Sequence, residues 1–468
     1  MLQLFGTAIG TLLVYATQIL AGALLTKALC PAVRGAPFWG RALLLGPWAL
    51  ALQLLVYHAI GLPFAPWLVV LPWWPCLVLL RRRSGAVAEP VATGGEGPRR
   101  IAVGLALAVS VVSLVGFGAE PVHDRDAMHN FAVFGRVFAA HQSLAIEALR
   151  GMVDAGHAEY PPLVALNEAL LFAVDEELGA WTVLPFFALA QLALGLLVIE
   201  AVWSAARPWR SLAVAALLLL LPQWLVTVGS AVPDGRLTAT VLLLGLEARR
   251  LVAGAARAEF AGVAAVGAAA LTKNEGVAVG AMALLVLAFW AARRGAGSRR
   301  PALIVALAVG AALVALWPLC RTWMGLHDEI ADGLLRRLTL APLAARMPEI
   351  VATWWELAAG VLPTGAPRWG ALWPLAALAA AVAFARERTR GAAVALVLAW
   401  LAHLGLYTAV FATTPHQLDW HLGTAAPRLF MHTSAWPVLL LGLGNAALDG
   451  VQNRTVASTG AGLSEARV

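Results

Sequence analysis

The chain has 468 residues, of which 61% are hydrophobic and only 13% are charged. A soluble protein of this length carries about a quarter charged residues, so the composition excludes an ordinary soluble globular fold. In so apolar a chain the net charge of +7 is expected to set membrane topology, and it does not indicate a nucleic-acid partner.

Apolar runs recur along the whole chain, and several approach the length of about 20 residues that crosses a bilayer. We therefore predict an all-α polytopic membrane protein with about thirteen transmembrane helices. The predicted spans are 2–26, 42–60, 64–80, 101–118, 181–203, 211–229, 237–250, 260–272, 277–292, 301–319, 371–385, 391–411 and 428–448. The first apolar run lacks a basic segment before it, which favours a retained helix over a cleaved signal.

The chain divides into three parts on this basis. Residues 1–100 form three spans and a polar linker, and residues 101–448 form the main transmembrane module. The remaining residues, 449–468, are polar and are expected to form a disordered tail. Two long loops, 119–180 and 320–370, interrupt the main module.

Basic residues are distributed unevenly over the loops. Two thirds of the 33 Lys and Arg residues fall in one set of loops, while most of the 26 acidic residues fall in the other. Because positively charged loops stay on the cytoplasmic side, we predict an N-terminus outside and a cytoplasmic C-terminus. The long, acid-rich loops then lie on the outer face, where chemistry is expected.

The first long loop opens with two carboxylates, Asp124 and Asp126, directly after an apolar span. A carboxylate at a membrane-bounded cavity can act as a general base, because its surroundings adjust its pKa to the working pH. Residues two apart do not share a helix face, so at most one of the two is expected to point into a site. The alternative is a solvated loop. Such a loop could hold a divalent ion, but no ligand spacing demands one, so no metal or other cofactor is predicted.

The same loop continues with a helical pattern over 131–149. Its stripe of Phe131, Phe134, Val137 and Phe138 indicates packing against a core or lipid.

A double proline, Pro161-Pro162, then stops the helical pattern and forces an extended backbone just before it. This geometry can hold His157 and Tyr160 near the carboxylates of the first loop. A purely structural turn is the alternative.

Further along the chain, Asp234 lies in the segment 230–236 that joins two predicted spans, and Lys273 and Glu275 lie between two short apolar runs. A Lys and a Glu flanked by apolar residues on both sides are costly unless they are paired or solvated, so these two are candidates for function. Lys273 is a compact point charge that suits a phosphate. The alternative is a local ion pair between Lys273 and Glu275.

The last candidates lie in the segment 419–432. Arg428 and His432 are four residues apart, so they share a helix face, and His421 precedes them. Pro427 suits the first turn of the final span. Arg428 could pair with a lipid phosphate through its guanidinium fork, or it could extend to the membrane interface.

These pieces have an order: Asp126-Ala127, then Tyr160-Pro161-Pro162, Asp234, Lys273-Asn274-Glu275-Gly276, and Trp420-His421-Leu422 followed by Arg428. Together they resemble the bacterial GT-C glycosyltransferases of the dolichyl-phosphate-mannose-protein mannosyltransferase-like group. The resemblance covers residues 101–445, and the first three spans lie outside it.

The resemblance implies a many-helix fold with amphipathic helices in a large first outer loop, located in the bacterial inner (plasma) membrane. It implies a polyprenyl-phosphate sugar donor and a lipid, glycan or protein acceptor, with membrane lipids as surroundings. Asp126, or else Asp124, would act as the base. The donor phosphate would be bound by Lys273, Arg428 and His421. Supporting roles would fall to Tyr160, His157, Asp234, Glu275 and His432.

Two other functions fit the same sequence. One is a ligase or polymerase of envelope glycans that uses a lipid diphosphate. The other is a lipid or sugar transporter or flippase, although transporters usually show internal repeats and charges near the bilayer midplane.

Overall fold

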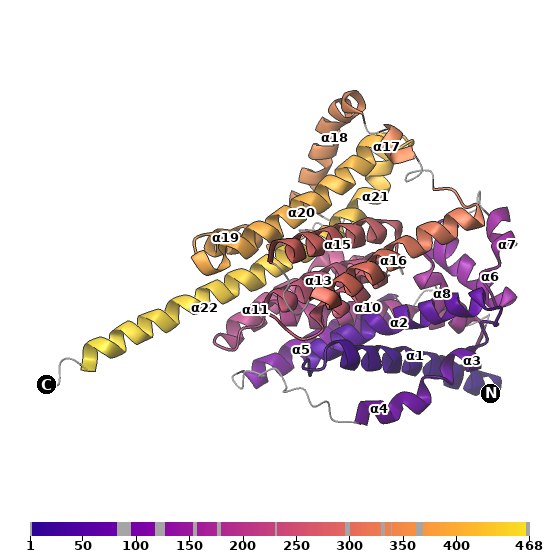
Figure 1. Ribbon diagram of the computed structural model, residues 1–468, viewed down its shortest axis with the longest axis horizontal. Helices are drawn as coiled ribbons and strands as arrows, with labels where there is room; N and C mark the ends of the chain where they lie inside the picture. The colour runs from indigo at the N-terminus through magenta and orange to yellow at the C-terminus, as the bar shows by residue number, and fades with distance from the viewer. Residues whose placement is uncertain are drawn as a thin grey trace.

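The computed structural model describes residues 2–81, 95–117, 127–152, 157–175, 179–229, 232–294, 300–328, 333–337, 339–361 and 368–464. The elements in these ranges are helices, as the apolar periodicity predicts. Figure 1 shows most of them running along the long axis of the molecule, with the two chain ends at opposite ends of that axis.

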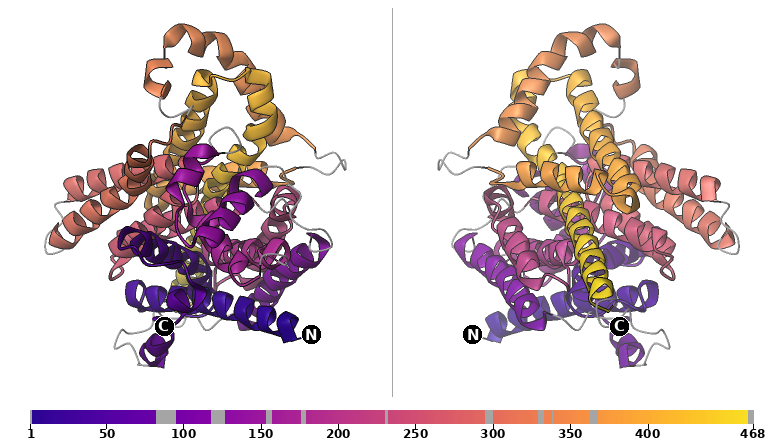
Figure 2. Two further views of the ribbon diagram at one scale, coloured as in Figure 1. Left: turned by 90° about the vertical axis from the view of Figure 1, so that its right-hand side faces the viewer. Right: turned by 90° about the vertical axis from the view of Figure 1, so that its left-hand side faces the viewer.

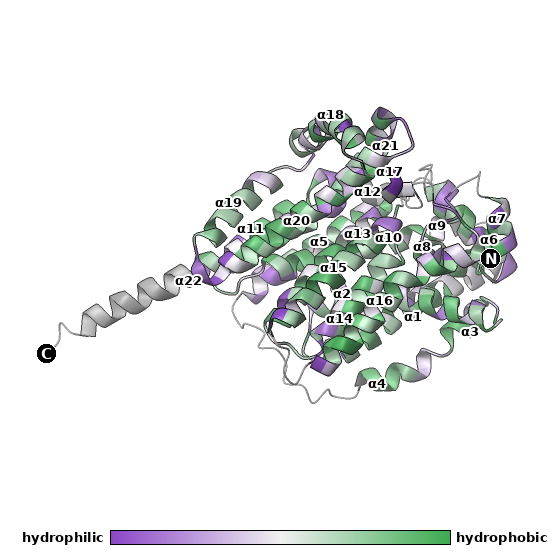
Figure 3. Ribbon diagram, turned by 45° about the horizontal axis from the view of Figure 1, so that its top comes forward, coloured by the Kyte–Doolittle hydropathy of each residue, from purple (hydrophilic) through white to green (hydrophobic). Residues whose placement is uncertain are grey.

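Seven helices of the described chain are long and apolar enough to cross a membrane. They are α1 (Leu2–Leu29), α2 (Ala36–Ala59), α5 (Glu96–Phe117), α10 (Leu184–Val202), α15 (Asn274–Arg294), α16 (Arg300–Met324) and α20 (Glu387–Thr413). Figure 3 shows hydrophobic residues covering most of their length. The protein is therefore a helical membrane protein, as predicted.

The other six predicted spans fall on helices that are shorter, divided or charged, so the number thirteen stays a prediction. These helices are α3 (Pro66–Val70), η1 (Trp74–Cys76), α4 (Leu77–Arg81), α11 (Pro208–Leu219), α12 (Pro222–Gly229), α13 (Asp234–Val252), α14 (Ala258–Ala270), α19 (Leu372–Phe384), α21 (Leu418–Thr433) and α22 (Ala435–Ser464). Prolines explain some of the divisions, since Pro222 begins α12 and Pro66 begins α3.

Two boundaries differ from expectation near the C-terminus. Helix α21 begins at Leu418, so Pro427 lies inside it and not in a first turn. Helix α22 continues to Ser464, past residue 449 where we expected a disordered tail to begin.

The segment 119–180 contains more structure than a loop. It holds η2 (Ala127–Ala132, a π-helix), α6 (Val133–His141), α7 (Ile146–Gly151), α8 (Leu163–Phe172) and α9 (Gly179–Thr182). The Phe131, Phe134 and Phe138 side chains are buried, which confirms the packing interpretation of the stripe. The helical pattern over 131–149 is interrupted, because Gln142 and Ala145 adopt left-handed backbone conformations.

Helix α8 was not predicted. All ten of its residues are buried, and it packs against α2 and α6. It runs antiparallel to α1, since Thr7 on α1 donates to Asp175 just after α8, while Gln18 donates to Asn167 within it. The start of α8 therefore lies level with the middle of α1.

Close helix packing depends on small residues. A Cβ atom on Gly22 of α1 would collide with the Ala42 carbonyl oxygen of α2, and one on Gly46 would collide with the Gln18 carbonyl oxygen. Such pairs of small residues allow membrane helices to approach closely.

The second long segment, 320–370, holds α17 (Leu334–Arg337) and α18 (Leu340–Ala359). Helix α18 packs against α20 and α21. Figure 2 shows α18 bridging the tips of these helices above the rest of the bundle.

Candidate functional site

The centre of the candidate site is Asp234, the first residue of α13, which is completely buried. Its Oδ1 atom accepts hydrogen bonds from Lys273 Nζ at 3.0 Å and from His432 Nε2 at 2.9 Å. Three segments that are far apart in the sequence therefore meet at a single carboxylate oxygen.

Lys273 lies at the tight turn between α14 and α15. Gly276 makes this turn feasible, because a Cβ atom there would collide with the Ala269 carbonyl oxygen. The Lys273 ammonium is 3.4 Å from Glu275 Oε1, so the local ion pair considered for the sequence is present. It is accompanied by the longer-range pair with Asp234, so a turn-stabilising role alone does not describe Lys273.

Two carboxylate oxygens in this site, Asp234 Oδ2 and Glu275 Oε2, are buried and have no hydrogen-bond partner among the described residues. Leaving a buried acceptor unpaired costs about 1–3 kcal/mol. Such atoms are available to the hydroxyl or amine groups of a ligand.

Arg428 lies on α21, one turn before His432. Its positive charge acts on both Asp234 and Lys273. We call Asp234, Lys273, Glu275, Arg428 and His432 the Asp234 cluster. Its two cations could neutralise a phosphate, and its free carboxylate oxygens could accept hydrogen bonds from hydroxyl groups.

A hydrogen-bonded chain of aromatic side chains contacts His432 at Nδ1, the ring nitrogen that does not face Asp234. The Tyr407 hydroxyl bonds to His432 Nδ1 at 2.8 Å and to His403 Nε2 at 2.8 Å. The Trp436 indole in turn donates to His403 Nδ1 at 3.0 Å. This network fixes the orientation of the His432 ring, and therefore which of its nitrogens faces Asp234.

The Tyr-Pro-Pro element lies beside the same turn. The backbone N–H of Leu163, directly after the two prolines, donates to the Leu271 carbonyl at 2.9 Å. The His157 and Tyr160 rings stack with centroids 4.6 Å apart, and His157 Nδ1 is 2.8 Å from Glu159 Oε1. The structure thus brings this element next to the Lys273 turn.

His421 lies at the edge of the site, in the first turn of α21. Its Nδ1 is 2.8 Å from the Thr414 hydroxyl. Burial lowers the pKa of His421 to about 4, and repulsion from the nearby His416 acts in the same direction. At neutral pH this ring would therefore contact a phosphate as an N–H donor and not as a cation.

Asp124 and Asp126 lie outside the described residues, so their positions are not assigned. The described chain resumes at Ala127, and Asn130 Oδ1 accepts a hydrogen bond from the His157 backbone N–H at 3.1 Å. No group of three His, Cys, Asp or Glu side chains that could hold a metal occurs within the described ranges.

Several site residues gave no clear signal in the sequence. Tyr407 and His403 are one helix turn apart in an apolar helix, so they resembled ordinary core residues. Asp328 was also missed, although it is buried and accepts from Asn274 Nδ2 at 2.8 Å and Arg321 at 2.7 Å. The acid-rich segment 320–370 was the only indication of it.

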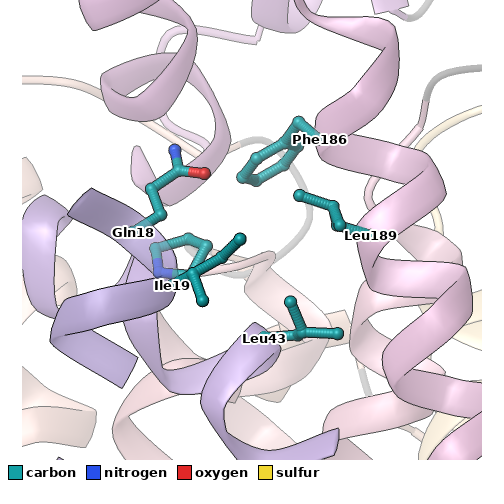
Figure 4. A pocket seen from close by; sticks show the side chains of 6 residues that line it. Gln18, Ile19, Leu43, Phe186 and Leu189 are labelled. Carbon is teal, nitrogen blue, oxygen red and sulfur yellow. The ribbon is translucent and has the colours of Figure 1, made fainter. Parts of the chain in front are cut away.

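A cavity elsewhere in the bundle is too small for a sugar. Figure 4 shows it between α1, α2 and α10, where Gln18, Leu43 and Phe186 line a volume of about 10 Å³. This space holds one water molecule at most. Pro47 contributes to the wall and Gln18 Oε1 has no partner among the described residues, which suits a bound water.

No family model, no curated protein and no solved structure matches this chain.

Proposed function

We propose that this chain is a membrane glycosyltransferase that moves a sugar from a polyprenyl-phosphate donor to a lipid, glycan or protein acceptor. The reaction takes place on the outer face of a bacterial inner membrane, opposite the Lys- and Arg-rich loops. The observation that supports this proposal most is the meeting of Asp234, Lys273 and His432, which come from three separate segments, next to the Tyr-Pro-Pro element.

In the proposed reaction, Lys273 and Arg428 act on the donor and Asp126 acts on the acceptor. Lys273 and Arg428 bind the donor phosphate and balance the charge on it as the bond between the sugar and the phosphate oxygen breaks. The electron pair of that bond leaves with the polyprenyl phosphate. The acceptor hydroxyl forms the new bond to the sugar, and its proton passes to Asp126.

The charge balance of the cluster favours a monophosphate donor over a diphosphate donor. Two carboxylates offset the charges of Lys273 and Arg428, so the cluster itself is close to neutral overall. A donor phosphodiester adds one negative charge and places it between the two cations. A diphosphate adds more charge without a further cation from this cluster, so it is the less favoured donor.

Transfer of a radiolabelled sugar in nanodiscs tests the proposal, with polyprenyl-monophosphate and polyprenyl-diphosphate sugars offered separately. We expect turnover with the monophosphate donor. We expect Asp126→Asn to fold and to lose transfer, and Lys273→Ala to raise the donor KM more than it lowers stability. Arg249→Ala is the matched control, because Arg249 is exposed at the far end of α13.

Four outcomes would count against the proposal. Turnover with the diphosphate donor alone would indicate a ligase or polymerase. Full activity of Asp126→Asn would remove the base assignment, and an unchanged donor KM in Lys273→Ala would remove the phosphate-binding role. Movement of the lipid-linked sugar across liposomes without any acceptor product would indicate a flippase.

A further inference from the structure

A groove of about 130 Å³ lies between α13, α14 and α15, away from the Asp234 cluster. Most of its wall is apolar, with Leu244, Val266 and Leu284 toward one end and Leu251 and Trp290 toward the other. Val252 and Val286 on its rim are more than half exposed, so the groove opens to the surroundings of the bundle.

One buried polar group faces this groove without a partner. Glu259, in the first turn of α14, is 7% exposed, and its Oε2 atom has no hydrogen-bond partner among the described residues. Glu247 also lines the groove, but Arg41 and Arg250 occupy its two oxygens at 2.7 Å each. A carboxylate that is buried and unpaired favours a ligand that brings a hydrogen-bond donor, preferably a charged one.

Basic residues stand at the same end of all three helices. Arg249 is exposed in the last turn of α13, and Arg293 is exposed near the end of α15. Arg257 directly precedes α14, but its guanidinium donates to the Ala28 carbonyl of α1 at 2.7 Å. A purely cationic amphiphile would be repelled by the exposed Arg249 and Arg293 at this end of the helices, and an anionic one would leave Glu259 Oε2 without a hydrogen-bond donor. A zwitterionic head with a primary ammonium and a phosphate satisfies both.

The apolar length of the groove suits part of an acyl chain. From Glu259 to Val266 helix α14 rises by about 10 Å, which is about two thirds of the hydrocarbon thickness of one leaflet. Gly262 keeps the middle of the groove open, because a Cβ atom there would have only the Glu247 Cβ within 4 Å, at 3.9 Å.

We propose that this groove binds one acyl chain of a phosphoethanolamine-headed phospholipid, with its ammonium donating to Glu259 Oε2. The phosphate of the same head lies toward Arg249 and Arg293, the exposed basic residues at the same end of the helices. The site is separate from the proposed glycosyl transfer and does not depend on it.

Native mass spectrometry of the full, delipidated chain in detergent tests this site, with three phospholipids of identical acyl chains added in turn. We expect saturable binding of phosphatidylethanolamine about tenfold tighter than that of phosphatidylglycerol, which has no ammonium. Phosphatidylcholine is expected to bind more weakly as well, because its quaternary ammonium cannot donate a hydrogen bond to Glu259.

Two variants distinguish binding of the lipid headgroup from binding of the acyl chain. Glu259→Gln should reduce phosphatidylethanolamine binding about tenfold and abolish the preference over phosphatidylglycerol. Gly262→Leu should fill the groove and weaken all three lipids. The matched controls are Glu387→Gln, an exposed first-turn glutamate of α20, and Gly405→Leu, where the added side chain meets open space; both should bind as wild type.

Equal binding of the three lipids to the wild-type chain would overturn the proposal, as would wild-type binding by Gly262→Leu. Either result would mean that lipid only surrounds the bundle. If Glu259→Gln fails to fold, Glu259→Asp and the headgroup comparison on the wild-type chain still decide the role of the carboxylate.

Discussion

Helix α13 carries a buried cluster of charges near each end, and the two clusters differ in how completely their carboxylates are paired. Near the C-terminal end, Arg41, Glu200, Glu247 and Arg250 form what we call the Arg41 cluster. Arg41 donates to both oxygens of Glu200, at 2.5 and 2.9 Å, and to Glu247 Oε1 at 2.7 Å. Arg250 donates to Glu247 Oε2, also at 2.7 Å, so all four carboxylate oxygens are occupied.

The Asp234 cluster at the start of the same helix is less complete, since Asp234 Oδ2 and Glu275 Oε2 have no partner within the described chain. Both clusters carry the desolvation cost of buried charge. In the Arg41 cluster every carboxylate oxygen accepts a hydrogen bond, and these bonds join α2, α10 and α13. In the Asp234 cluster two carboxylate oxygens can still accept hydrogen bonds, which is the property expected of a binding site. The first cluster should therefore control folding, and the second should control activity.

Arg41→Met provides the largest expected effect. It leaves Glu200, which is 12% exposed, without Arg41 and leaves the buried Glu247 with Arg250 alone, which should lower the free energy of unfolding by about 3–5 kcal/mol. Thermal unfolding in detergent, followed by the fluorescence of the chain's 19 Trp residues, measures this loss. The control is Arg100→Met, whose ion pair with Glu96 has both side chains more than 60% exposed. It should cost only about 0.3–0.5 kcal/mol. Equal stability of the two variants would remove the structural role of the Arg41 cluster.

Asp234→Asn tests the other half of the comparison. The amide oxygen can still accept from Lys273 or His432, so the stability loss should be about 1–3 kcal/mol, below that of Arg41→Met. Sugar transfer should fall by a factor on the order of 100, because the charge that organises the cations is gone. Glu247→Gln in the Arg41 cluster should show the reverse, with lower stability but unchanged specific activity of the folded protein. Full transfer by Asp234→Asn would show that the open cluster is also structural.

The sequence pointed to Lys273 and Glu275 because charges flanked by apolar runs are unusual, and to Arg428 and His432 because they share a helix face. A supporting role for Asp234 was implied only by the family resemblance. The sequence also predicted a helical membrane protein from the long apolar runs. It could not predict the Arg41 cluster, because Arg41 directly precedes the predicted span 42–60 and is expected in a loop, whereas its side chain is only 1% exposed. Topology rules count charges, but they do not reveal which helices will pack around one of them.

Helix α8 shows the second limit. Its ten residues are apolar except Asn167 and Glu168, so the run is too short for a span and was included in a loop. Its burial comes from α1, α2 and α6, and none of these contacts is encoded by local periodicity. Short buried helices therefore escape methods that search for spans.

Tyr407→Phe tests whether the orientation of His432 matters for the Asp234 cluster, because it removes a hydrogen bond to His432 without changing any charge. Losing the hydroxyl breaks the bonds to His432 and His403, which should cost about 0.5–1.5 kcal/mol for each net hydrogen bond. Transfer should fall about tenfold, mainly in kcat, because the His432 ring is no longer held against Asp234. Tyr57→Phe is the control, since its hydroxyl donates to the Leu68 carbonyl in a different region. Equal losses of transfer in both variants would contradict a positioning role for Tyr407.

The smallest expected effect is the pH dependence of stability that His421 causes. The Arg41 cluster has no histidine, so its contribution to stability should depend less on pH. Burial holds the pKa of His421 at about 4 in the folded protein, against an ordinary value of 6.5. Between these values the unfolded chain binds a proton that the folded chain does not. The stability that the neutral ring contributes is therefore fully present above pH 6.5 and is lost as the pH falls toward 4. The unfolding midpoint should drop across this window, and His421→Gln should flatten the drop, while His141→Gln, at an exposed position, should leave it unchanged. If His421→Gln instead keeps the wild-type pH profile, the edge of the Asp234 cluster admits water freely, and His421 could then bind a phosphate as a cation.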